Sequence, residues 1–109
     1  MISLSGDVRQ MALRPDETDL IGRWIKSGDR VVGDQVEERI HDLIAHQLQK
    51  IALHPQSGSW QVLYLDPNDG RYWELTYPKG EMHGGGPRRL THLSPALATA
   101  KYRLGNDQA

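Results

Sequence analysis

The sequence contains no cysteine, which excludes disulfide bridges and thiolate metal sites from the outset. No stretch approaches the ~20 apolar residues that a membrane span needs, and residues 1–10 lack the apolar run of a signal peptide. The formal net charge of −1 argues against a generic nucleic-acid binder. We therefore expect a cytoplasmic protein that engages neither a membrane nor nucleic acid.

The chain length of 109 residues predicts one domain with one modest core. The first residues are polar and show no sustained hydrophobic period, and the last five follow the final predicted helix. We expect residues 1–12 to form a flexible leader, residues 13–104 a single domain, and residues 105–109 a tail.

Apolar residues recur at helical spacing from Asp34 to Ile51, which predicts the main helix. Asp34 is a favoured N-cap, and Glu37 stands three residues later, where a capping box places an acid. The stripe consists of Val36, Ile40, Leu43, Ile44, Gln47 and Ile51. It is typical of a helix that covers a sheet.

The remaining segments predict strands at residues 20–26, 30–32, 60–65, 71–77 and 89–93. One helical turn is expected at residues 14–18, and a short helix over 96–103 follows the capping pair Ser94-Pro95. The predicted fold is α+β: a small antiparallel sheet of about five strands, covered by one main helix, with a short C-terminal helix.

The turn-forming residues 66–70 join two strands into a predicted hairpin. If Asp66 pairs with Arg71, one hairpin face is almost wholly apolar and should pack under the main helix. That face consists of Trp60, Val62, Tyr64, Trp73, Leu75 and Tyr77. The other face is mixed and should meet solvent or a partner: Gln61, Leu63, Leu65, Tyr72, Glu74 and Thr76.

The sequence lacks the motifs that would indicate catalysis or a cofactor. His83-Gly84-Gly85-Gly86 is similar to the oxyanion loop of some esterases, but no Gly-x-Ser-x-Gly turn accompanies it. The five histidines show no metal-ligand spacing, and the glycine triplet does not follow a phosphate-binding pattern. We expect no enzyme activity, no cofactor and no metal.

Residues 69–78, Asp-Gly-Arg-Tyr-Trp-Glu-Leu-Thr-Tyr-Pro, and residues 81–87, Glu-Met-His-Gly-Gly-Gly-Pro, carry a family resemblance. These seventeen ordered identities resemble the signature of immunity protein 27, and the likeness extends over roughly residues 13–103. Proteins of this kind are encoded beside bacterial polymorphic toxins. The resemblance implies that the chain binds one cognate toxin domain and neutralises it.

The resemblance supplies no binding residues, so two candidate surfaces come from patterning. The first is the outer hairpin face with the following loop: Asp69, Arg71, Tyr72, Glu74, Glu81, Met82 and His83. The second is the acidic part of the main helix: Asp34, Glu37, Glu38 and Asp42. Residues 16–42 hold eight acids against four bases, a pattern typical either of an ordinary solvated surface or of one that steers a basic partner.

Two other functional classes stay open. A small-ligand or peptide-binding module could use an open sheet edge, and a small enzyme is a more remote alternative. A pocket lined by Glu81, His83 and the glycines would favour either alternative, whereas a flat polar face would favour the inhibitor.

Overall fold

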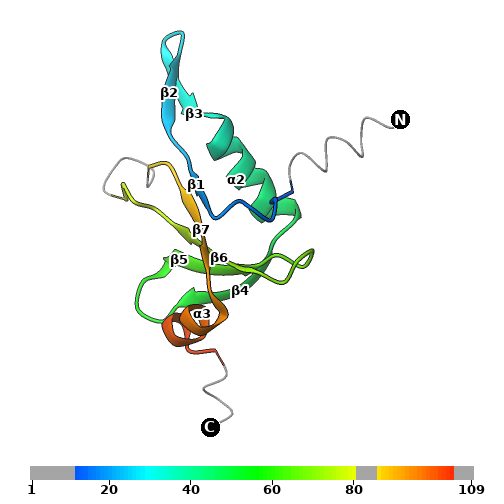
Figure 1. The fold of residues 1–109 in the computed structure, drawn as a ribbon. Helices are drawn as coiled ribbons and strands as arrows, with labels where there is room; N and C mark the ends of the chain where they lie inside the picture. The colour runs from blue at the N-terminus through cyan, green and yellow to red at the C-terminus, as the bar shows by residue number, and fades with distance from the viewer. Residues whose placement is uncertain (1–11, 81–85, 105–109) are drawn as a thin grey trace.

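The computed structural model describes residues 12–80 and 86–104, and their fold is α+β as the sequence predicts (Figure 1). In chain order the elements are β1 (Asp19–Ile21), β2 (Trp24–Ser27), β3 (Arg30–Gly33), α2 (Gln35–His46), β4 (Gln49–His54), β5 (Gly58–Leu65), β6 (Tyr72–Thr76), β7 (Arg89–Leu93) and α3 (Pro95–Tyr102). Five strands form one antiparallel sheet in the order β1-β7-β6-β5-β4. Strands β2 and β3 form a separate hairpin, which projects from the body in Figure 1.

Helix α2 and helix α3 cover opposite faces of the five-stranded sheet. Ile40 and Leu43 of α2 pack in one cluster with Trp73 and Leu75, whereas Ala98 and Tyr102 of α3 pack in another with Leu63 and Leu93. Because neighbouring strand residues point to opposite faces, these two clusters lie on the two sides of the sheet. The protein therefore has three layers, with a small core on each side of the sheet.

The predicted register of the β5–β6 hairpin is confirmed. Tyr64 pairs with Trp73 and Val62 with Leu75, and all four are buried on the side of α2. Gly70 takes a φ of +78°, the conformation that the turn requires and that glycine adopts without strain. The expectation for Trp60 is wrong, because its side chain is 52% exposed; its ring meets Tyr77 edge-on, with ring centroids 5.2 Å apart.

The mixed hairpin face is not open, which corrects a second expectation. Leu63 is fully buried and Glu74 is 5% exposed, because α3 lies over them. The cap of α3 forms as predicted, since the Ser94 side chain accepts from the Leu97 amide and Pro95 is the first helical residue. The sequence predicted this helix but not the surface on which it packs.

The main helix ends five residues earlier than predicted, at His46 instead of Ile51. The amides of Gln47 and Leu48 both donate to the Leu43 carbonyl, and residues 49–54 then pair with β5 as an edge strand. Ile51 fits the helical stripe in sequence, but in the fold it packs in the cluster beneath α3. Pairing with β5 therefore overrides the local helical pattern.

The strand predicted over residues 20–26 is broken into β1 and β2. At Gly22 an added Cβ would lie 2.7 Å from Glu37 Oε1 and 2.9 Å from the Arg88 carbonyl oxygen, so this crossing accepts only glycine without rearrangement. The turn at residues 14–18 is a single hydrogen-bonded turn, closed by the Glu17 amide and the Arg14 carbonyl, and is not helical. Residues 1–11, most of the glycine loop (81–85) and residues 105–109 lie outside the described part of the chain.

Candidate partner-binding groove

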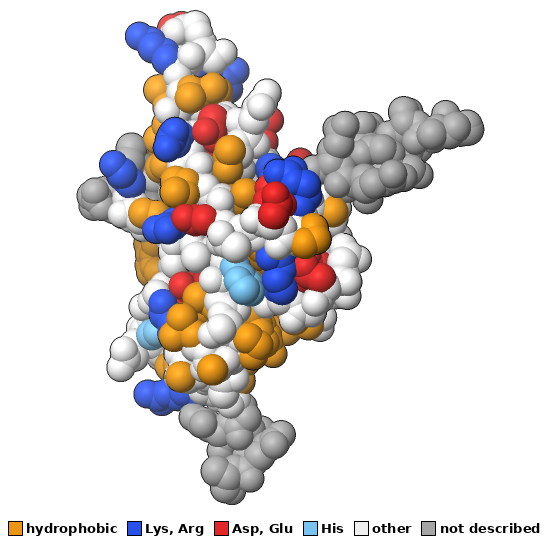
Figure 2. Space-filling model, in the orientation of Figure 1, with side chains coloured by type: hydrophobic (Ala, Val, Ile, Leu, Met, Phe, Trp, Pro, Cys, Tyr) orange, Lys and Arg blue, Asp and Glu red, His pale blue; other side chains and the backbone are white. Residues whose placement is uncertain are grey.

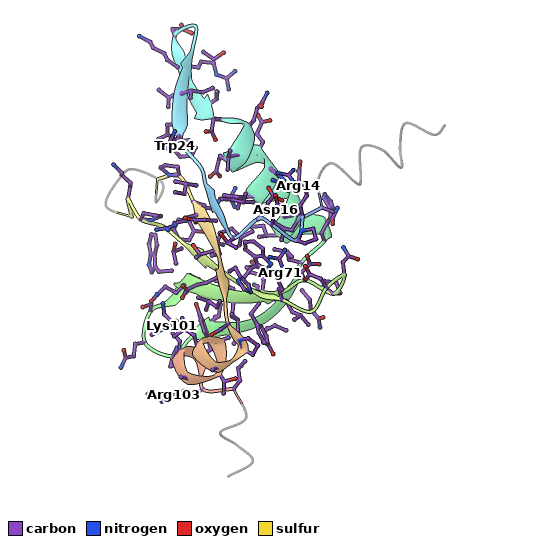
Figure 3. All side chains as sticks on the ribbon, in the orientation of Figure 1. Arg14, Asp16, Trp24, Arg71, Lys101 and Arg103 are labelled. Carbon is purple, nitrogen blue, oxygen red and sulfur yellow. The ribbon has the colours of Figure 1, made fainter. Side chains whose placement is uncertain are left out.

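An open groove of about 420 Å³ lies between α2 and the root of the β2–β3 hairpin. The residues that line it are Trp24, Gly33, Glu37, Glu38, His41, Asp42 and Arg88. They come from four segments: β2, β3, α2 and the loop before β7. Figure 3 labels Trp24 where β2 leaves the body of the protein. The groove thus includes three of the four acids in the second predicted surface.

Asp34 fixes the two walls of the groove relative to each other. Its side chain accepts from the Glu37 amide at 2.8 Å, which caps α2. The same side chain accepts from the Arg23 amide at 3.2 Å, and the Asp34 amide donates to the Arg23 carbonyl at 2.9 Å. Asp34 therefore joins the start of α2 to the root of the hairpin, and its Oδ1 accepts both of these hydrogen bonds within the fold.

The floor of the groove is a nearly buried ion pair between Glu37 and Arg88. The Arg88 amide donates to Glu37 Oε1 at 2.9 Å, and Arg88 Nε donates to Glu37 Oε2 at 2.8 Å. The capping-box position thus holds an acid as predicted, but its carboxylate accepts hydrogen bonds from Arg88, 51 residues away in sequence. Gly33 gives it room, because a Cβ there would lie 2.5 Å from Glu37 Cγ.

Glu38 and Asp42 are the two groove acids that the fold does not use. Within residues 12–80 and 86–104, no hydrogen bond or ion pair engages either carboxylate. They stand four residues apart on α2, so they share one face of the helix. Glu38 is exposed, Asp42 is half-buried, and Trp24 lies half-buried in the same groove. Two carboxylates and an indole can hold a lysine or arginine side chain through ion pairs and a cation–π contact.

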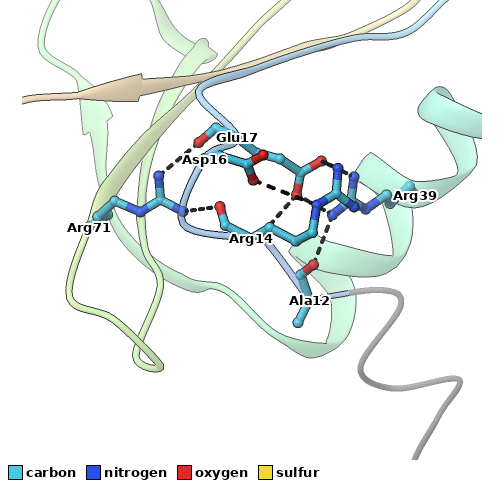
Figure 4. Close-up of polar contacts among 6 residues, drawn as sticks. All are labelled: Ala12, Arg14, Asp16, Glu17, Arg39 and Arg71. Atoms are coloured by element: carbon cyan, nitrogen blue, oxygen red, sulfur yellow. Dashed lines mark hydrogen bonds and ion pairs between the residues drawn. The ribbon is translucent and has the colours of Figure 1, made fainter.

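The first predicted surface is engaged mostly within the fold. Asp69 accepts from the Arg71 amide at 3.0 Å and from Arg71 Nε at 2.7 Å. Burial raises the pKa of Asp69, but these bonds outweigh it and hold the pKa below the ordinary value. Arg71 also donates to the carbonyl oxygens of Glu17 and Arg14, at 2.7 and 2.9 Å (Figure 4). Its guanidinium lies over the Trp73 ring, 4.9 Å from the ring centroid. Arg71 therefore fastens the N-terminal segment to the sheet.

The other described members of that surface lie under or beside α3. Tyr72 is half-buried against the cluster formed with α3, and Glu74 is buried with Tyr102 and Lys101. Glu81, Met82 and His83 lie outside the described residues, so the full predicted set stays a prediction. The pocket that Glu81, His83 and the glycines would line also lies outside the described residues.

Arg39 holds the N-terminal segment from the other side (Figure 4). Its Nη1 and Nη2 donate to the two carboxylate oxygens of Glu17 at 2.6 and 2.7 Å, and Nη2 also donates to the Ala12 carbonyl at 2.8 Å. The hydrogen bonds from Arg39 lower the pKa of Glu17 to about 2, against a smaller opposing effect of burial. This bidentate pair is part of the scaffold, and neither residue lines the groove.

Four groove residues were not predicted as site residues: Trp24, Gly33, His41 and Arg88. In the sequence, Trp24 resembles an ordinary strand residue and His41 a scattered surface histidine. Arg88 stands between the glycine loop and the strand predicted at residues 89–93. The one signal in the sequence was the excess of acids over residues 16–42. Among the described residues no group of histidines and carboxylates is placed to hold a metal, and no helix has the length and apolarity to cross a membrane.

Comparison with known proteins gives a family match. A family model described as immunity protein 27 matches residues 26–94, a shorter span than the resemblance noted in the sequence. Neither the curated proteins nor the solved structures yielded a match. The matched residues run from within β2 to just past the end of β7 and include every groove residue except Trp24. The match covers more than half of the chain, and the protein belongs to the immunity protein 27 family.

Proposed function

We propose that this protein binds the toxin domain of its own polymorphic toxin system and neutralises it by occupation, without catalysis. In this proposal it protects the producing cell during interbacterial competition and acts in the cytoplasm, which a cysteine-free chain permits. Family membership supports the toxin as partner. The single observation that favours a particular surface is the groove with two unengaged carboxylates beside Trp24.

The groove is favoured over the hairpin face for an energetic reason. Glu74 and Arg71 already make internal hydrogen bonds, and a partner that used them would have to break those bonds. Glu38 and Asp42 carry charges with no competing described donor, so a basic toxin surface can pair with them at no internal cost. Complementary charge also raises the rate of encounter. A basic protein surface with a lysine or arginine at its centre is the partner that this groove fits.

The first experiment tests toxin protection. Cells that co-express the toxin domain encoded beside this gene should grow when this chain is present, and should die with an unrelated toxin. The purified pair should bind with nanomolar affinity or better, which corresponds to about 12 kcal/mol. Failure of rescue with both proteins soluble would exclude the proposed function.

The second experiment places the interface. Glu38→Gln combined with Asp42→Asn keeps side-chain size and removes both charges, and should weaken toxin binding by at least about tenfold. Asp16→Asn is the matched control, because Asp16 is an exposed acid in a loose pair with Arg14 at 3.6 Å, away from the groove. If Tyr72→Ala weakens binding and the groove variant does not, the first predicted surface is the interface instead.

A small cationic ligand is the second candidate occupant of this groove. The volume of about 420 Å³ falls within the usual range of small-molecule sites, about 300–1,000 Å³. Titration with free arginine and lysine, monitored by calorimetry, separates this function from toxin binding. Saturation at micromolar concentration, with no toxin rescue, would favour the ligand-binding module.

A further inference from the structure

The β2–β3 hairpin stands apart from the five-stranded sheet. Its strands pair only with each other, and a lone two-stranded hairpin is marginally stable in water. Val31 is 66% exposed and Ile25 is 47% exposed, although both are apolar strand residues. Figure 2 shows the hairpin at the top of the molecule with basic side chains at its tip. Such a hairpin is held at its root by Asp34 and is otherwise open to contact.

The basic side chains of the hairpin, like Lys50, Lys79 and Arg103 of the body, form no ion pair with the described residues. Within residues 12–80 and 86–104, ion pairs to carboxylates engage Arg14, Arg39, Arg71, Arg88, Arg89 and Lys101. No such pair engages the side chains of Arg23, Lys26 or Arg30. Residues 23–33 carry these three cations and one acid, Asp29. The hairpin therefore presents uncompensated positive charge directly beside the acidic groove.

The strand register shows which side of the hairpin continues the groove. Trp24 pairs with Gly33 and Lys26 with Val31, and residues directly opposite each other share one side of a hairpin. Trp24 and Gly33 line the groove, so Lys26 and Val31 extend that wall by one further pair, roughly 7 Å along the strands. Ile25, by the same alternation, lies on the reverse side.

We propose that the groove-side face of the β2–β3 hairpin, formed by Trp24, Lys26 and Val31, is the second half of the toxin interface. This inference rests on the proposed function. The toxin surface that fits both halves places a lysine or arginine over Glu38 and Asp42, and a carboxylate beside an apolar patch against Lys26 and Val31. The neighbouring charges of opposite sign fix the orientation of the toxin, because a reversed partner would place like charges together.

The test uses the full chain and the toxin domain encoded beside its gene, with affinity measured by calorimetry. Lys26→Glu combined with Val31→Asp should weaken binding at least about thirtyfold, as loss of an interface hot spot does. Ile25→Thr on the reverse side is the matched control within the hairpin and should stay within about threefold of wild type. Leu97→Asp, at another exposed apolar position on α3, is the control outside the hairpin and should also stay within about threefold of wild type.

The outcomes separate this inference from the proposed function. If the Lys26/Val31 variant binds like wild type while the Glu38/Asp42 variant is weakened, the hairpin inference is wrong and the proposed function stands. If wild type does not bind this toxin, both fail. Equal losses in the Ile25 and Lys26/Val31 variants would also overturn the inference, because they would indicate a general need for a folded hairpin. Amide exchange over residues 24–33 should slow in the wild-type complex, and unchanged exchange would contradict the proposed contact.

Discussion

Tyr102 Oη donates a hydrogen bond of 2.7 Å to Glu74 Oε2 in the interior between α3 and the sheet. Lys101 Nζ lies 2.8 Å from the same oxygen, so two consecutive residues of α3 hold one carboxylate of β6. Burial raises the pKa of Tyr102, and the adjacent Glu74 raises it further, which keeps the phenol protonated as a donor. This contact fixes α3 over the hairpin face that the sequence left open to a partner.

Tyr102→Phe should destabilise the protein by about 1–3 kcal/mol, because it removes one donor from a buried carboxylate without changing the packed ring. Urea unfolding monitored by tryptophan fluorescence measures the loss. Toxin affinity should stay unchanged, since the residue lies away from the groove. A large loss of affinity with normal stability would mean that the α3 side of the sheet takes part in binding.

Trp73→Ala should cost roughly 3–5 kcal/mol of stability, as large truncations in a core do. Trp73 is fully buried against Ile40 and Leu43 of α2, so its removal leaves a cavity at the centre of that cluster. Denaturant unfolding measures the effect, and Trp60→Ala is the control because Trp60 is half exposed. Equal costs for the two substitutions would contradict the observed burial.

Acid should weaken the N-terminal anchor through Glu17. Its pKa falls from 4.5 to about 2 in the folded protein, so the paired carboxylate stabilises the fold above pH 4.5. That contribution, at most about 3 kcal/mol, is lost as pH falls from 4.5 towards 2. Glu17→Gln should therefore be less stable than wild type at pH 6 and nearly equal to it at pH 2. Parallel unfolding curves at the two pH values measure the difference, and a gap independent of pH would contradict the assignment.

Gly22→Ala should destabilise the fold by about 1–3 kcal/mol and disturb the floor of the groove. The new methyl would meet Glu37 Oε1 at 2.7 Å and the Arg88 carbonyl oxygen at 2.9 Å, and the second contact is with backbone that has little room to move. Thermal melting measures the loss. The control is Gly28→Asn, in a turn with open space around it and a φ of +65° that asparagine tolerates. A neutral Gly22→Ala would show that the β1–β2 crossing can relax.

The sequence determined the local features of this protein. Asp34 and Ser94 cap the predicted helices because a short polar side chain satisfies the free amides of a first turn. The pairing of Tyr64 with Trp73 follows from turn residues and strict alternation, which a shift of one residue would destroy. These features depend on neighbours within one element or one hairpin, so their signals lie within a few residues of each other.

Tertiary structure decided the features that depend on distant segments. Residues 49–51 continue a helical pattern in the sequence. They form an edge strand because their backbone groups hydrogen-bond to β5. Glu74 looks exposed in the alternation of β6, yet α3 covers it. The groove likewise needs Trp24, Asp42 and Arg88 from three separate segments. The composition indicates an acidic region. Only the packed structure shows that Asp34 and Glu37 accept hydrogen bonds within the fold, whereas Glu38 and Asp42 make none with the described residues.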